Sequence, residues 1–153
     1  MNLINSMIPR YFGVILLLVS QVTSAELEII SWQDLAPEYD GSLELDGVAW
    51  GERVRLELNE KDVRIPGFIV PLDFEERQSV TRFLLVPYFG ACIHEPPPPP
   101  NQTIYVEFEP GYKLESFWQP FWIEGKIFVS RVEEDLATAL YTLGAEKVEP
   151  YEY

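Results

Sequence analysis

The feature that most restricts the fold of this chain is its proline content. Its 153 residues include 13 prolines, and five of these are consecutive at Pro96–Pro100. A proline inside a helix removes a backbone hydrogen bond and clashes with the preceding turn, so a chain this rich in proline forms few long helices. Five prolines in a row adopt polyproline II, a stiff spacer about 15 Å long without internal hydrogen bonds. This distribution predicts strands joined by stiff loops.

The composition indicates one folded and strongly acidic domain. Hydrophobic residues make up 47% of the chain and aromatic residues 14%, which is enough to build a core. Acidic residues outnumber basic residues 25 to 11, giving a formal net charge of -14. Such a surface repels phosphate backbones, so we expect no nucleic-acid partner.

The first 25 residues have the pattern of a secretory signal peptide. Arg10 precedes an apolar run, Tyr11–Val19, and Thr23 and Ala25 place small residues three and one positions before a cut at Glu26. The run is too short for a membrane anchor, which needs about 20 apolar residues. We therefore predict a signal peptide over residues 1–25 and a single periplasmic domain over residues 26–153, with no membrane span after cleavage.

Alternating apolar and polar residues predict a mainly β domain. The expected strands are Val54–Leu58, Val63–Leu72 with a bulge or sharp bend at Pro66–Gly67, Thr81–Phe89, Thr103–Phe108, and one or two segments within Phe121–Val132 broken at Gly125–Lys126.

Helical signals lie at the two ends of the domain. Ser31 and Asp34 have the positions of a cap for a short N-terminal helical turn. Leu136, Leu140 and Leu143 recur at helical spacing and predict a C-terminal helix. Five strands with these two elements favour a small OB-like five-stranded barrel, and a β-sandwich is the alternative.

Residues 90–102 contain the only cysteine, Cys92, and the only histidine, His94, of the chain. A strand that continued through this segment would place both side chains on one side. Together with Glu95 they could bind zinc or a similar ion, and zinc is the one cofactor that we consider. Alternatively, His94 activates Cys92 as a nucleophile. In the structural alternative, Cys92 is a small buried apolar residue and His94 bonds to a backbone carbonyl.

Two further segments are candidates for partner binding. A partner with an aromatic groove could bind the polyproline run together with the two residues after it, a set made up of Pro96, Pro97, Pro98, Pro99, Pro100, Asn101 and Gln102. The segment Phe117–Trp122 holds four large aromatic residues in six positions. Such a cluster could stack on a sugar or a partner if exposed, but we expect it mainly to pack in the core.

Three stretches of this sequence resemble the bacterial domain-of-unknown-function family 3299 (DUF3299). They are Val63–Leu72, Phe83–His94 and the run from Glu95 through five prolines to Asn101–Gln102. The resemblance covers roughly residues 60 to 108 and extends more loosely to Ser31–Trp32. It implies a small exported bacterial protein without an assigned activity. It further implies a companion of cell-envelope ABC transport systems, some of which are thought to handle metals.

These observations lead to one functional hypothesis and one alternative. We expect a periplasmic accessory or binding protein of a cell-envelope transport system, which could bind a transition metal through the loop of Cys92 and His94. The alternative is a structural interaction module whose proline loop and aromatic patch contact a membrane protein. We do not expect an enzyme, and a Cys92-dependent enzyme ranks third.

Overall fold

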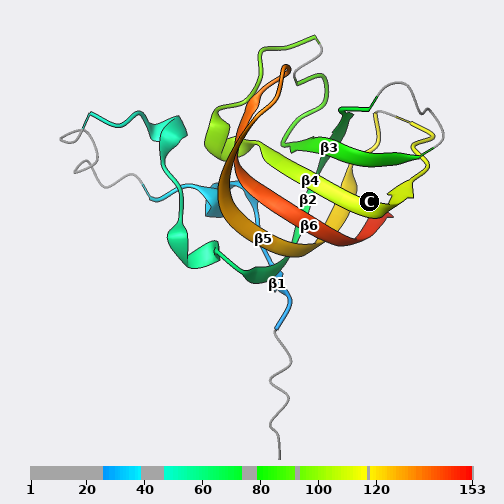
Figure 1. The fold of residues 1–153 in the computed structure, drawn as a ribbon, viewed down its shortest axis with the longest axis horizontal. Helices are drawn as coiled ribbons and strands as arrows, with labels where there is room; N and C mark the ends of the chain where they lie inside the picture. Colours follow the sequence, from blue (N-terminus) through cyan, green and yellow to red (C-terminus); the bar gives the residue numbers. More distant parts are fainter. Residues whose placement is uncertain (1–25, 39–46, 74–78, 92–93, 117, 153) are drawn as a thin grey trace, which may run out of the picture.

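The computed structural model describes residues 26–38, 47–73, 79–91, 94–116 and 118–152, and about half of them lie in β-strands (Figure 1). The predicted signal peptide lies outside this part of the chain. The strands are β1 (Glu28–Ile29), β2 (Lys61–Pro71), β3 (Val80–Val86), β4 (Ile104–Tyr112), β5 (Phe121–Glu133) and β6 (Thr138–Pro150). Short 3-10 turns are η1 (Trp32–Leu35), η3 (Trp50–Glu52), η4 (Leu56–Leu58) and η5 (Pro100–Gln102). No helix within the described ranges is long and apolar enough to cross a membrane.

Five of the strands form a hydrogen-bonded ring. They follow the order β2-β3-β4-β6-β5, and pairing between β2 and β5 closes the ring. Strands β4 and β6 are parallel, the other neighbours in the ring are antiparallel, and β1 adds to β2 in parallel. The predicted mainly β fold is confirmed. A single ring of five strands corresponds to the OB-like prediction and not to a sandwich of two sheets.

Strand β2 changes its neighbour at Pro66–Gly67, where the sequence predicts a bulge or bend. Its first half pairs with β5 as far as Gly67, and its second half pairs with β3 from Phe68 onward. The indole Nε1 of Trp32 donates to the carbonyl oxygen of Pro66 at 2.7 Å. A Cβ atom at residue 67 would lie 2.8–2.9 Å from side-chain atoms of Leu85 and Trp32. Glycine therefore suits this position because the side chains of Leu85 and Trp32 both pack directly on the strand.

The predicted C-terminal helix is wrong, because Thr138–Pro150 forms strand β6. This strand pairs with β5 along nearly its whole length and with β4 from Tyr141 to Gly144. Ala139, Tyr141 and Leu143 alternate toward the core and are almost completely buried. The leucines have the spacing of a helix, whereas Ala139, Tyr141 and Leu143 have the two-residue spacing of a strand. Hydrogen bonding to a neighbouring strand on both sides favours the strand.

Two other predicted strands differ from the structure. Val54–Leu58 is not a strand: it ends in η4, with Leu58 buried in the core and Leu56 exposed. The edges of β2 beside Val63 are already occupied by β1 and β5, so this segment has no edge to join there. Strand β5 continues through Gly125–Lys126 with only a register shift at Gly125.

The core fills the ring and joins it to the N-terminal segment. Tyr141 is the largest completely buried side chain among the residues that the structure describes, and its hydroxyl donates to the carbonyl oxygen of Leu35 at 2.5 Å. The same hydroxyl accepts a hydrogen bond of 2.7 Å from the backbone nitrogen of Arg55. The predicted cap of the N-terminal turn is present, since Asp34 accepts hydrogen bonds from the hydroxyl and the backbone nitrogen of Ser31. One tyrosine of β6 therefore anchors two segments that lie outside the ring.

Candidate functional site

The connection between β3 and β4 carries most of the residues singled out from the sequence. Strand β3 ends at Val86, and the chain turns at Gly90, which has a φ of 85°. The backbone nitrogens of His94 and Glu95 both donate to the carbonyl oxygen of Gly90, at 2.9 and 3.0 Å. The strand therefore does not continue to His94, and the argument that would align Cys92 with His94 on one side does not hold.

The proposed metal ligands are only partly described. His94 and Glu95 both lie exposed on the turn, whereas Cys92 lies outside the described residues. Within the described ranges, no three His, Cys, Asp or Glu side chains are grouped so that they could hold a metal ion. Because the thiol is not among them, the zinc site stays a prediction.

The proline run lies with one side against the domain and the other toward solvent. Pro98 is buried, whereas Pro96, Pro97 and Pro99 are exposed. The tyrosine hydroxyl of Tyr88 donates to the carbonyl oxygen of Pro96 at 3.0 Å and ties the start of the run to the end of β3. The three exposed prolines are thus held in place and remain accessible.

The connection also rests on the β5–β6 hairpin. Ala91 is completely buried in a second, smaller apolar cluster that includes Ala137 from the turn of the hairpin. Figure 1 shows the connection rising beside the tip of that hairpin, above one end of the ring. The surface of the loop is therefore supported by packing beneath it.

Asn101 and Gln102 hold neighbouring loops. The side-chain nitrogen of Asn101 donates to the carbonyl oxygens of Trp50 at 2.7 Å and Arg53 at 3.0 Å, and Asn101 is completely buried. The side-chain nitrogen of Gln102 donates to the carbonyl oxygen of Trp32 at 3.0 Å. In this conformation Asn101 offers no surface to a partner, and these two residues position the end of the proline run.

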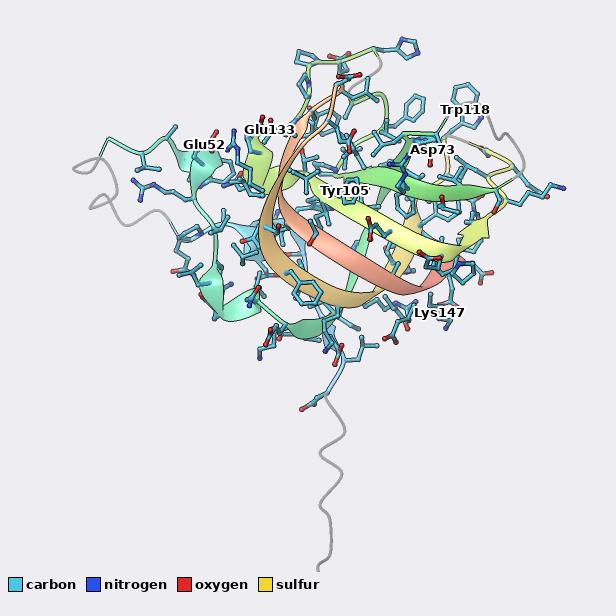
Figure 2. The ribbon with its side chains drawn as sticks, in the orientation of Figure 1. Glu52, Asp73, Tyr105, Trp118, Glu133 and Lys147 are labelled. Atoms are coloured by element: carbon cyan, nitrogen blue, oxygen red, sulfur yellow. The ribbon has the colours of Figure 1, made fainter. Side chains whose placement is uncertain are left out.

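An aromatic surface begins at Tyr88, the residue that is hydrogen-bonded to the proline run. We call it the aromatic platform and define it as Phe68, Tyr88, Phe89 and Trp118. The ring of Phe89 lies 6.2 Å from that of Phe68 and 5.4 Å from that of Trp118, measured between centroids. Tyr88, Phe89 and Trp118 are 41%, 43% and 72% exposed. Figure 2 shows the side chain of Trp118 pointing away from the strands.

The expectation for Phe117–Trp122 is thus met only in part. Phe121 is buried in the core and Trp122 is half-buried, but Trp118 is an exposed member of the platform. Phe117 lies outside the described residues. Tyr88 and Phe89 did not stand out in the sequence because they continue an apolar stretch that has the appearance of a buried strand.

A shallow groove of about 540 Å³ begins at Trp118. Its described lining consists of Ser116, Trp118, Gln119, Pro120, Tyr151 and Glu152. The backbone nitrogen of Tyr151 donates to the carbonyl oxygen of Pro120 at 2.9 Å and so joins two of these lining residues. Trp118 belongs to both features, so the platform and the groove form one continuous surface.

A positively charged side chain of the domain itself, that of Arg64, contacts aromatic and acidic residues close to this groove. The guanidinium carbon of Arg64 is 4.8 Å from the ring centroid of Trp122, and this ring stacks on that of Tyr151. Arg64 also pairs with Glu124 at 2.9 Å and Glu149 at 3.5 Å. This part of the domain therefore already binds a guanidinium group between an indole and carboxylates.

Comparison with known proteins identifies the family. A family model described as "Protein of unknown function (DUF3299)" matches residues 36–150. The chain belongs to the DUF3299 family. The resemblance inferred from the sequence is confirmed at that level.

A solved relative supports the same assignment. The crystal structure of a DUF3299 family protein from Pseudomonas aeruginosa PAO1 is 37% identical and matches with a TM-score of 0.70. The match covers 84% of this chain and 98% of that chain. Among curated proteins, none matches this chain. The family description names no function, so the chemistry of the site is argued from its geometry.

Proposed function

We propose that this DUF3299 protein is a periplasmic binding protein that serves as an accessory of a cell-envelope transport system. It docks on a membrane-protein component of that system through the aromatic platform and the exposed prolines. The observation that carries the proposal is the platform, in which three aromatic side chains are exposed and one of them, Tyr88, is hydrogen-bonded to the proline run. The pattern of residues 1–25 supports export.

The platform has the properties of a protein interface. Single exposed apolar residues are common on protein surfaces, but here ring contacts join Phe68, Phe89 and Trp118 into one patch. Aromatic residues are enriched in interfaces because they bury a large area and have few rotatable bonds. The prolines lose little conformational freedom on binding, which lowers the entropic cost of association.

Site-specific photo-cross-linking in the exporting host tests the proposal. A photoreactive phenylalanine analogue replaces Trp118 in one variant and Leu56 in a control variant. Both positions are 72% exposed, but Leu56 lies in η4, outside the platform. We expect position 118 to cross-link to an integral membrane component of a transporter and position 56 not to do so. The proposal is wrong if position 118 gives no membrane protein, or the same products as position 56.

Zinc binding is a second proposal for the same connection between β3 and β4. His94 and Glu95 are exposed on a turn fixed by two hydrogen bonds to Gly90, and Cys92 is two residues away from His94 in the chain. Calorimetric titration of the reduced protein with zinc should show binding that both Cys92→Ser and His94→Ala remove. Binding that neither substitution changes, or no binding, would exclude this site. Neither proposal includes a catalytic step.

A further inference from the structure

We infer that the groove beside Trp118 binds a positively charged side chain, an arginine or a lysine, of the docking partner. The cation lies on the indole of Trp118 and pairs with the carboxylate of Glu152. This inference rests on the proposed function and specifies the chemistry of the partner at that same surface.

The lining of the groove matches a cationic group. Trp118 presents an indole, the aromatic ring that attracts a cation most strongly, and it is 72% exposed. Glu152 adds a negative charge to the same groove, and its described lining contains no basic residue. An indole face and a carboxylate together suit a guanidinium or ammonium group.

The domain contains an internal example of this arrangement. Arg64 lies over the ring of Trp122 and pairs with Glu124 and Glu149. Tyr151 stacks on Trp122 and also lines the groove, so it contributes to both the internal site and the proposed one. The groove thus contains the same combination of an indole and a carboxylate that binds the guanidinium group of Arg64 in the internal site.

The charge of the whole chain favours the same occupant. Acidic residues exceed basic residues by 14, so a positively charged partner is attracted from a distance and a negative one is repelled. A neutral sugar could also stack on an aromatic groove with polar residues such as Ser116 and Gln119, but it would gain nothing from Glu152 or from the net charge. The observations therefore favour a cation, and a sugar becomes an alternative outcome of the test.

Fluorine NMR on the full chain, purified after processing by its host, tests the inference directly. The chain has four tryptophans, so labelling with 5-fluorotryptophan gives four signals, and Trp118→Phe assigns one of them. The probe is a blocked glycine-arginine-glycine peptide, and its control carries citrulline, a neutral analogue of arginine. We expect the arginine peptide to shift the Trp118 signal saturably. The signal of Trp50, which is 43% exposed outside the groove, should not move.

The strength of this binding should depend on charge. The citrulline peptide should bind about tenfold more weakly, because it loses both the ion pair and the cation–π contact. Glu152→Gln should weaken the arginine peptide about two- to fivefold. Glu146→Gln, which removes an exposed carboxylate of β6 that does not line the groove, should leave the affinity unchanged. Raising the salt concentration should weaken binding of the arginine peptide in the wild type.

Several results would overturn the inference. It is wrong if the Trp118 signal does not respond, if citrulline binds as well as arginine, or if Glu152→Gln has no effect. It is also wrong if chitotriose or maltotriose shifts the Trp118 signal and the arginine peptide does not. Cross-linking at position 118 separates this failure from failure of the proposed function. If position 118 cross-links to a membrane component but the arginine peptide does not bind, the proposed docking surface stands and the cation site is wrong. If the arginine peptide binds but position 118 captures no membrane component, the cation site stands and the proposed function is wrong.

Discussion

Replacing Tyr141 by phenylalanine tests the anchor between the ring and the N-terminal segment. The hydroxyl of Tyr141 donates to the carbonyl oxygen of Leu35 and accepts from the backbone nitrogen of Arg55. Phenylalanine keeps the aromatic ring in the core but removes both hydrogen bonds. The substitution therefore isolates the polar contribution of one side chain.

The expected loss follows from the burial of the two backbone groups. Leu35 is completely buried, so its carbonyl oxygen loses its partner without gaining water, which costs about 1–1.5 kcal/mol. Arg55 as a residue is half-buried, so its backbone amide can regain water more easily, and we assign its lost hydrogen bond about 0.5–1 kcal/mol. The free energy of unfolding should fall by about 2 kcal/mol, which lowers the Tm by about 6–10 °C in a domain of this size.

Urea unfolding followed by tryptophan fluorescence measures this loss. The matched control is Tyr88→Phe, whose hydroxyl donates to Pro96 at the surface and should contribute less than about 0.5 kcal/mol. A decrease below about 0.5 kcal/mol for Tyr141→Phe, or equal decreases for both variants, would refute the reasoning.

The pH dependence gives the same anchor a second test. Burial raises the pKa of the Tyr141 hydroxyl above its ordinary value of 10.0. The unfolded chain therefore releases this proton at lower pH than the folded chain, and the resulting stability is lost as the pH rises above about 10. Phenylalanine cannot ionise, so the difference in unfolding free energy between wild type and Tyr141→Phe should narrow there. A difference that stays constant up to pH 11 would contradict the assignment.

Three further predictions concern stability. Gly125→Ala places a Cβ atom against the carbonyl oxygen of Gly144, and urea unfolding should show a loss of about 1–3 kcal/mol. Gly144→Ala, where the Cβ meets nothing within 4 Å, should change the stability far less, and equal losses would contradict the packing argument. Hydrogen bonds from the hydroxyl and the backbone nitrogen of Ser31 lower the pKa of Asp34 below 3.8. The stability that Asp34 contributes is therefore present above pH 3.8 and is lost as the pH falls through its lowered pKa. The urea midpoints of wild type and Asp34→Asn should differ at pH 7 and approach each other as the pH falls below 3.8. Asn101→Ala leaves two backbone carbonyl oxygens without their donor and should lower the free energy of unfolding by about 1–3 kcal/mol in urea unfolding. Unchanged stability would contradict this structural role and leave partner binding as the alternative role of Asn101.

Local patterns in the sequence were sufficient for part of the fold. The alternation of Ile104, Val106 and Phe108 predicts β4, and these three side chains point into the core as expected. Ser31 and Asp34 predict the cap of η1, because both partners of that motif lie within one turn of chain. In each case the pattern and the interaction are local, so sequence alone is adequate.

The candidate site was only partly visible in the sequence. The density of aromatic residues at Phe117–Trp122 pointed to the correct segment but not to the exposed side chain within it. Strand β5 starts at Phe121, and this start decides which aromatic residues face the core. Trp118 precedes the strand and meets Phe89, which lies 29 positions earlier in the chain. The connections after β3 and β4 bring these rings together, and no local pattern encodes that contact.

The sequence by itself determined that this chain is acidic, rich in strands and a member of its family. The tertiary structure decided the state of residues 138–150 and the composition of the binding surface. Leu136, Leu140 and Leu143 suit a helix, but Ala139, Tyr141 and Leu143 suit a strand equally well. Pairing with β4 and β5 satisfies the backbone on both sides and buries the second set. A segment with two compatible periodicities takes its structure from the neighbours it meets, because only those neighbours supply the hydrogen bonds and the burial that separate the two states.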